Sequence, residues 1–217
     1  MNDQSAKPRR GCFFYGCITS LVLLALILGA LLFGLYYVKK LVNRYTDTGP
    51  MELPALQMSQ SEIDKVKQRF EAFQEAVRQQ QPTKPLTLTA DDINALITSG
   101  PGQQALSRKF YVSLEGNQLK GEVSVPLKEL GLPMFKGRYL NGSATFELSF
   151  RNGALSITPQ TIMVKGNPLP EVYMKEIRKQ DLAAGFTNEP KVVAVLQGLQ
   201  DIQVTEGKLV IEPKEKQ

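Results

Sequence analysis

The chain has no histidine, and its only two cysteines, Cys12 and Cys17, lie near the N-terminus. Imidazole bases are therefore excluded throughout, and thiol nucleophiles and the usual zinc ligands are excluded from residues 45–217. GxSxG, SxxK, P-loop and GxGxxG motifs are also absent. A hydrolase built on this chain would have to use carboxylates and hydroxyls alone. We therefore expect a protein that is not an enzyme and that holds no cofactor and no metal.

The acidic residues form only one adjacent pair, Asp91–Asp92. Asp92 stands three residues after Thr89, which is the spacing of a capping box: the threonine caps a helix and the acidic side chain returns the hydrogen bond. A helix cap is therefore the preferred interpretation of the pair. A catalytic or metal-binding role is the alternative.

Residues 141–143, Asn-Gly-Ser, match the acceptor sequence for N-linked glycosylation. The pattern is short and occurs often by chance, and Asn-Gly is also a common turn sequence. We therefore expect a turn at this point rather than a modification site.

Charged side chains are missing from one long stretch, Gly11 to Val38. As a helix this stretch would be about 42 Å long, against roughly 30 Å of hydrocarbon in a bilayer. A cleavable signal peptide is the alternative, but its apolar region usually spans about 7–15 residues and ends at a small-residue cleavage site. Here the run continues through Phe33 and ends at Tyr36–Tyr37 and two lysines, as in a membrane-interface belt. We predict an uncleaved transmembrane anchor.

The flanking charges do not orient this anchor, because three cations lie on each side of it. They are Lys7, Arg9 and Arg10 before the anchor and Lys39, Lys40 and Arg44 after it. The cysteines favour one orientation, since both lie on the N-terminal side and none occurs in the domain, as suits an oxidising compartment. We expect a single-pass protein of the bacterial plasma membrane with its C-terminal domain outside the cytoplasm.

The net charge of +5 arises from the flanks of the anchor. Six of the 26 lysines and arginines lie there, which leaves 20 in residues 45–217, and 20 of the 21 acidic residues lie in that same part. The domain is formally neutral with both signs interspersed, so it has no positive field that would follow a nucleic-acid backbone. The membrane is the expected partner, and nucleic acid is not.

The chain is expected to divide into one anchor and one domain, without an internal repeat. Residues 43–58 contain Gly49, Pro50 and Pro54 and are typical of a linker. About 160 residues remain, enough for one hydrophobic core. The expected parts are a cytoplasmic tail (1–10), a transmembrane anchor (11–38), a juxtamembrane linker (39–58), an extracytoplasmic domain (59–212) and a tail (213–217).

The domain is predicted to begin with a helix, because Ser59-Gln-Ser-Glu62 is a second capping-box pattern. Apolar residues then recur at steps of three and four from Ile63 to Val77 and make one stripe. The stripe either packs on the domain's own sheet, which we prefer, or forms a short coiled-coil seam. Further helices are expected after Thr89, over residues 168–184, and from Asn188 to Gly198.

From residue 110 onward the apolar period changes from 3.6 to 2, which indicates strands. Three pairs of strands are joined by the turn sequences Gly116-Asn117, Asn152-Gly153 and Glu206-Gly207. The pairs are 110–115 with 118–125, 143–150 with 154–164, and 199–205 with 208–211. Such hairpins, with helices before and after them, predict an α+β fold in which one antiparallel sheet has helices packed on one face and follows the transmembrane helix.

The segment from Pro126 to Asn141 has no regular apolar period, although it carries large apolar side chains beside cations. It is either a crossover loop that packs on the core, or a surface that contacts a ligand, the bilayer or a partner. The candidate contact residues are Leu132, Met134, Phe135, Tyr139 and Leu140.

Two stretches, LTADDINALI at residues 88–97 and NGSATFELSFRNGALSITPQTIMVKGNPLP at 141–170, carry a resemblance. With the order of elements over residues 86–212, the chain resembles the YpmS-like group of bacterial envelope proteins. The resemblance implies one N-terminal membrane helix, an exported α+β domain and a non-enzymatic role. It implies no catalytic or ligand-binding residues.

Two functions follow from these expectations. The first, which we prefer, is an anchored domain that binds a lipid or another apolar ligand of the envelope. The second is a structural or assembly accessory that acts through protein contacts with an envelope partner. An apolar cavity lined by the sheet and the 126–141 segment would favour the first, and a filled core with an exposed apolar patch would favour the second. The oligomeric state stays open.

Overall fold

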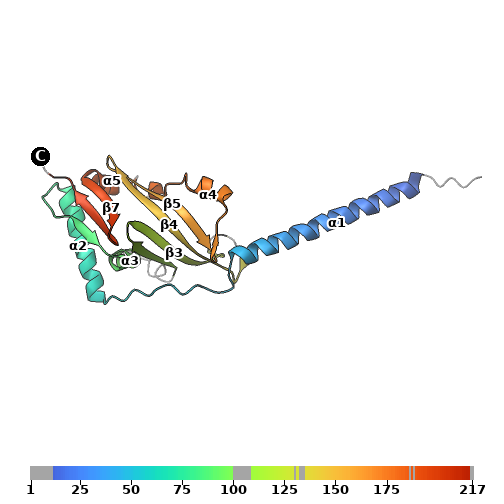
Figure 1. Ribbon diagram of the computed structural model, residues 1–217, viewed down its shortest axis with the longest axis horizontal. Coiled ribbons are helices and arrows are strands. Elements are labelled where there is room, and N and C mark those ends of the chain that lie inside the picture. Colours follow the sequence, from blue (N-terminus) through green and yellow to red (C-terminus); the bar gives the residue numbers. More distant parts are fainter. Residues whose placement is uncertain are drawn as a thin grey trace, which may run out of the picture. The chain divides into compact units, whose positions relative to one another are not determined.

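The computed structural model describes residues 12–99, 109–129, 131, 135–185, 187 and 189–215, with side chains from Ser20 onward. The chain forms two compact units, Met1–Arg44 and Tyr45–Gln217. Helix α1 (Cys12–Tyr45) belongs almost entirely to the first unit, and the sheets and remaining helices belong to the second (Figure 1).

Helix α1 is the apolar helix that the charge-free stretch predicts. Its part from Ser20 to Tyr45 is long and apolar enough to cross a membrane, and none of its apolar window is buried in the structure. Large side chains such as Leu32 and Phe33 are exposed, as expected of a surface that lipid covers. The helix is compatible with a single-pass anchor or a signal sequence, so its role as an anchor stays a prediction.

The second unit is α+β, as predicted, but it contains two antiparallel sheets rather than one. The five-stranded sheet, in the order β2-β3-β4-β5-β6, consists of β2 (Phe110–Glu115), β3 (Gln118–Pro126), β4 (Tyr139–Arg151), β5 (Ala154–Val164) and β6 (Asn167–Pro168). The three-stranded sheet, in the order β1-β8-β7, consists of β1 (Leu86–Leu88), β8 (Lys208–Pro213) and β7 (Leu199–Thr205). The prediction of a single sheet was wrong because the last hairpin pairs with β1 and not with the other strands.

All three predicted hairpins, β2–β3, β4–β5 and β7–β8, are present. At the β4–β5 turn, Asn152 (φ 53°) and Gly153 (φ 78°) both have left-handed backbone conformations, as a type I′ turn requires. Strand β3 also pairs directly with β4. The residues between them therefore connect neighbouring strands, and the interpretation of 126–141 as a crossover was wrong.

The pairing register gives the five-stranded sheet one apolar and one polar face. Leu119 lies opposite Phe146, and Leu148 lies opposite Ile157. Thr145, whose side chain points to the other face, is polar. The alternation in the sequence thus predicts correctly which side chains of β4 share a face.

The described helices of the second unit begin and end at caps that the sequence partly predicts. They are α2 (Gln60–Arg78), α3 (Ala90–Thr98), α4 (Glu171–Ile177), the 3₁₀ helix η3 (Leu182–Gly185) and α5 (Pro190–Gln197). Ser59 and Thr89 form capping boxes with Glu62 and Asp92. Asp92 also forms an ion pair of 2.9 Å with Arg69 of α2. Asp92 thus has the capping role predicted for it, and it also links α3 to α2.

The helix predicted over residues 168–184 is broken into α4 and η3. The Asp181 carboxylate between them accepts a hydrogen bond of 2.9 Å from the Ile157 amide, and Arg178 donates one of 3.0 Å to the Gln160 carbonyl. Both partners are backbone groups of β5. The α4–η3 segment, residues 171–185, therefore lies along an edge of the sheet, and the prediction that all helices pack on one face was wrong.

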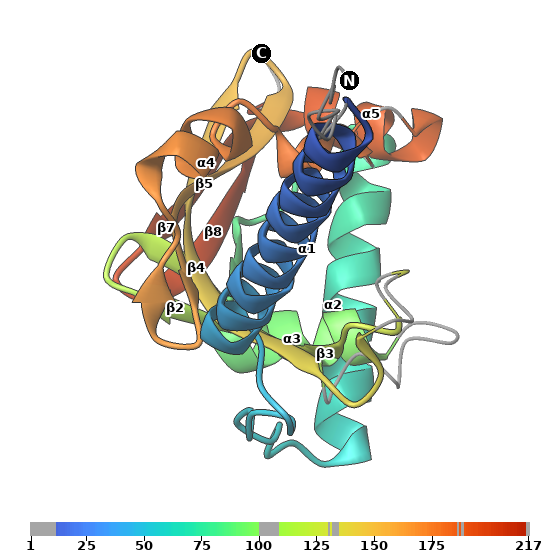
Figure 2. The ribbon, with the colours of Figure 1, turned by 90° about the vertical axis from the view of Figure 1, so that its right-hand side faces the viewer.

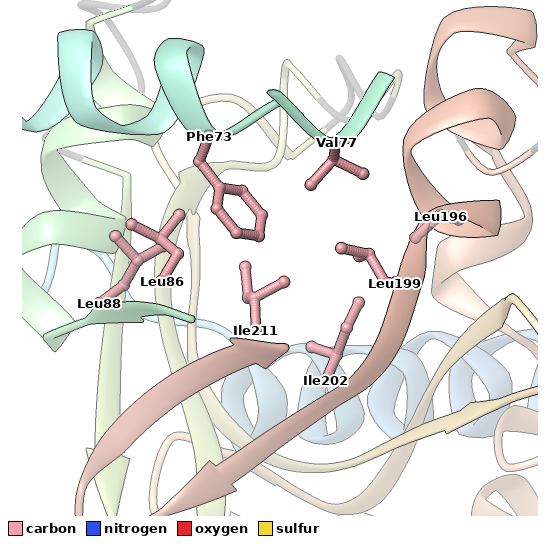
Figure 3. Close-up of a cluster of buried hydrophobic side chains, with 8 residues drawn as sticks. All are labelled: Phe73, Val77, Leu86, Leu88, Leu196, Leu199, Ile202 and Ile211. Atoms are coloured by element: carbon pink, nitrogen blue, oxygen red, sulfur yellow. The ribbon is translucent and has the colours of Figure 1, made fainter. Parts of the chain in front are cut away.

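The main hydrophobic core lies between α2 and the three-stranded sheet, and Figure 2 shows α2 to one side of β7 and β8. Phe73 and Val77 of α2 point toward Leu199, Ile202 and Ile211 (Figure 3). Side chains of β4 and β5 pack against the same cluster. The apolar stripe of α2 thus packs on the protein's own sheet, as preferred above, and not on a partner helix.

Candidate functional site: an apolar groove between two helices

Three of the five candidate contact residues lie in the described part of the chain. Tyr139 and Leu140 are half-buried at the start of β4, where they lie opposite Pro126 and Val125 of β3. Phe135 is also half-buried. Leu132 and Met134 lie outside the described residues. The structure therefore makes Tyr139 and Leu140 strand residues rather than loop residues.

Tyr139 also holds the chain segment that follows α1, residues 46–51, which we call the strap. The backbone of Tyr139 exchanges two hydrogen bonds with the backbone of Asp47, with N–O distances of 2.9 and 2.8 Å. Arg138 donates to the Thr46 carbonyl at 3.1 Å, and Lys165 forms an ion pair of 3.1 Å with Asp47. The strap is thus held against the five-stranded sheet by directed polar contacts.

Asn141 is the centre of the contact between the strap and the sheet. Its Nδ2 donates to Asp47 Oδ2 and to the Gly49 carbonyl at 3.0 Å each. Its Oδ1 accepts from the Met51 amide at 3.2 Å and from the Ser124 hydroxyl at 2.8 Å. Because Asn141 is a buried residue of β4, the turn expected there was wrong, and its amide is not accessible to a glycan in the folded protein.

A second region has the shape of a ligand site: a groove between α2 and α5 over β7 and β8. Its volume is about 630 Å³, within the range of pockets that hold small molecules. The apolar lining includes Phe70 and Phe73 of α2, Val192 and Val195 of α5, and Ile202 and Ile211 of the sheet. The groove therefore draws its walls from two helices and its floor from the core strands.

The lining becomes more exposed from the floor to the walls. Ile202 and Ile211 are buried, whereas Phe70, Val192 and Val195 are only partly buried and pack against the edge of the core cluster. Apolar surface removed from water contributes about 25 cal/mol per Å². A ligand that covered these three wall residues would gain that contribution without disturbing the core.

Gly198 sets how closely the end of α5 approaches α2. A Cβ atom at this position would lie 2.5 Å from Val77 Cγ1 and 3.3 Å from the Val77 carbonyl oxygen. Only glycine permits such an approach of backbone to side chain. Pro190 stands in the first turn of α5 and Gly198 follows its last residue, so the sequence predicts the bounds of this helix but not the groove beside it.

The rim of the groove is polar and carries charges of both signs. Glu71, Glu75 and Arg78 lie on the α2 side, and Lys191 lies on the α5 side. Arg78 forms an ion pair with Glu75. An apolar interior with a few polar groups at its mouth is the arrangement that binds and orients an amphipathic ligand.

The three side chains whose pKa values are clearly shifted lie outside the groove. A hydrogen bond from Ser59 lowers the pKa of Glu62 at a helix cap, and burial raises the pKa of Tyr111 on β2. A hydrogen bond from the Ile157 amide lowers the pKa of Asp181 at the sheet edge. Within the described ranges, no group of three acidic, cysteine or histidine side chains is placed to hold a metal ion.

No known protein-family model matches the chain. No solved structure matches it significantly either. The groove is therefore interpreted from its own chemistry, and the resemblance to the YpmS-like group stays a prediction.

Sequence reasoning missed the groove because its walls are far apart in the chain. The sequence places Phe70 in the apolar stripe of α2 that is predicted to pack on the sheet, whereas in the structure Phe70 is only partly buried and lines the groove. Val192 and Val195 are three residues apart and share a helix face, which was the only local indication of a second wall. Nothing in the sequence shows that this face of α5 lies opposite α2.

Proposed function

We propose that the protein is a non-catalytic domain, anchored in the bacterial plasma membrane and lying outside the cytoplasm, that binds a lipid in the groove between α2 and α5. The observation that carries the proposal is an open apolar groove of about 630 Å³ with a polar rim. The same chain carries a helix long and apolar enough to cross a membrane. A domain held at a membrane has acyl chains available at high effective concentration.

The expected ligand is an acyl chain with a polar head. Each methylene group that leaves water contributes about 0.8 kcal/mol, and Phe70, Val192 and Val195 would cover the chain. Lys191, on the rim, would lie near the head group. Acidic side chains also stand on the rim, so the head group is expected to be zwitterionic or singly charged.

The proposed location rests on three observations from the chain. The apolar run ends in two tyrosines and two lysines, the domain lacks cysteine, and the resemblance to the YpmS-like group implies an exported domain. A structural or assembly role through protein contacts is the alternative. It is favoured by the exposed apolar side chains of α4, Val172 and Tyr173.

The proposal is tested by filling the groove without removing a core side chain. Ala72 lines the groove on the exposed surface of α2, so Ala72→Trp places an indole in the ligand's space. Ala194 is also exposed but lies on α5 outside the lining, and Ala194→Trp is the matched control. The full chain and both variants would be released from membranes and weighed by native mass spectrometry.

We expect the wild-type chain and Ala194→Trp to retain a lipid mass, and Ala72→Trp to lose most of it. Thermal melting should show that both variants are folded. Equal lipid retention by the two variants would place the lipid outside the groove, and a wild-type chain without lipid that forms a stable oligomer would support the assembly role instead.

A further inference from the structure

The described residues of the second unit expose four large apolar side chains, and three of them lie on the α4–η3 segment. They are Val172 (68% exposed), Tyr173 (56%) and Leu182 (49%); the fourth is Phe110 of β2 (42%). Such a concentration of exposed apolar side chains on one short segment marks a contact surface.

Two charged side chains of this segment contact the backbone of β5. Arg178 donates to the Gln160 carbonyl, and Asp181 accepts from the Ile157 amide. Met174 and Ala183 are buried beneath the segment. These two hydrogen bonds and the two buried side chains hold the segment at the sheet edge. The exposed side chains of Val172, Tyr173 and Leu182 take no part in the core.

The ion pairs around the exposed side chains leave one cation, Lys175, for a contact with an anionic group. Glu171 is paired with Arg178 at 2.5 Å, and Glu176 is paired with Lys179 at 2.7 Å. Lys175 is exposed and has no carboxylate partner among the described residues. Residues 171–185 are thus formally neutral, with three cations and three carboxylates, and Lys175 is the cation that these ion pairs leave over, on the same segment as two aliphatic side chains and a tyrosine.

We propose that the α4–η3 segment contacts the interface of the bilayer, with Val172, Tyr173 and Leu182 among the upper acyl groups and Lys175 beside the lipid phosphates. Aliphatic residues, tyrosine and lysine together are the composition of segments that lie in this layer. The proposal rests on α1 as a membrane anchor, because the tether makes a small contact effective. It is independent of what the groove binds.

The absence of tryptophan from the chain makes a direct test available. Tyr173→Trp and Phe110→Trp each introduce one indole at an exposed aromatic position, and the second is the matched control away from the segment. Each full-length variant would be reconstituted into liposomes of phosphatidylcholine and phosphatidylglycerol whose acyl chains carry bromine. Bromine quenches indole fluorescence only at close range.

We expect bromolipid to remove most of the fluorescence of Tyr173→Trp and little of that of Phe110→Trp. The quenching should decrease in liposomes of phosphatidylcholine alone, and decrease likewise when Lys175→Glu is added. Val172→Trp serves as a second reporter should Tyr173→Trp melt at a lower temperature than the wild-type chain. Equal quenching at positions 173 and 110 would overturn the proposal. The proposal would also be overturned by a shift of the indole emission that changes with the protein-to-lipid ratio and not with bromolipid. Such a shift would indicate that the surface contacts a second protein chain.

Discussion

Asn152 and Gly153 determine how β4 returns into β5. Both have a positive φ, which a β-branched residue does not adopt without strain. A Cβ atom on Gly153 would also lie 3.7 Å from the Gln197 Cα at the end of α5. We expect Gly153→Val to lower the free energy of unfolding by about 1–3 kcal/mol.

Chemical denaturation of the full chain in a fixed detergent would measure this loss. Asn152→Gly is the control, since glycine accepts the same backbone conformation and should cost little. An unchanged midpoint for Gly153→Val would show that the turn tolerates a side chain there and that its geometry is different.

Asp181 links stability to pH. The hydrogen bond from the Ile157 amide lowers its pKa, with help from the Ala183 amide and the Ser156 hydroxyl and against a smaller raising effect of burial. A carboxyl whose pKa is lower in the folded than in the unfolded chain stabilises the fold above its unfolded pKa of about 3.9. That contribution is lost as the pH falls through the folded pKa.

We therefore expect Asp181→Asn to melt at a lower temperature than the wild-type chain at pH 7. The difference should shrink as the pH falls below about 4. Melting curves from pH 7 down to pH 3 would measure it, with Asp64→Asn on the exposed surface of α2 as the control. A difference that stayed constant over this range would show that the carboxylate charge is not what holds the segment.

Among the secondary-structure elements, the edge strand β2 and the exposed edge of β5 are covered by side chains of neighbouring helical segments. The Asn94 amide of α3 donates to the Val112 carbonyl at 2.7 Å and accepts from the Val112 amide at 2.8 Å, as a neighbouring strand would. Arg178 and Asp181 do the same for β5. Edges occupied in this way are not available for pairing with another chain, which limits aggregation.

The strap gives the next prediction. Asn141→Ala removes the partners of Asp47 Oδ2 and of the Gly49 carbonyl. It also removes the acceptor of the buried Ser124 hydroxyl and one of the two acceptors of the Met51 amide, which keeps its hydrogen bond of 3.0 Å to Ser124. We expect a loss of about 1–3 kcal/mol of stability, the cost of leaving the buried Ser124 hydroxyl and the half-buried polar groups of the strap without these partners.

Hydrogen exchange measured by mass spectrometry should show faster exchange at the Met51 amide in Asn141→Ala, because the Ser124 hydroxyl that still accepts from this amide is no longer held by Asn141. Ser143→Ala, two residues along the same strand, is the control and should leave that amide protected. Equal exchange in both variants would mean that the strap is held by Tyr139 and Lys165 without the asparagine.

The sequence predicts those elements whose structure is determined by residues close together in the chain. The capping boxes at Ser59 and Thr89 and the turn at Asn152-Gly153 each depend on a few adjacent residues, and all three are confirmed. The pairing of β1 with β8 joins segments from opposite ends of the unit, and no local pattern encodes it. The strap was equally hidden, because its contacts are polar and leave no apolar period in the sequence.

Over the whole second unit, helices α2 and α5 share one core with both sheets, and this core leaves a groove at its margin. Phe73 and Val77 complete the core, while Phe70 of the same stripe contributes to the groove wall. The sequence shows that all three side chains share a face of α2, but how deeply each is buried depends on the position of α5. Gly198, which permits α5 to approach α2, therefore matters as much to the groove as the residues that line it.

The central claim is that an acyl chain occupies this groove while the protein is in its membrane. A fatty acid that carries a photoreactive diazirine near the end of its chain, incorporated into membranes that contain the full-length protein, would test it most directly. After illumination, peptides that carry the label would be mapped by mass spectrometry.

We expect labelling of the groove walls, around Phe70 of α2 and Val192 and Val195 of α5, in addition to the labelling of α1 expected of a membrane helix. Ala72→Trp should remove the label from the groove and leave that on α1 unchanged. Labelling of α1 alone, in wild-type protein that is folded and fully reconstituted, would contradict the claim that the groove binds lipid.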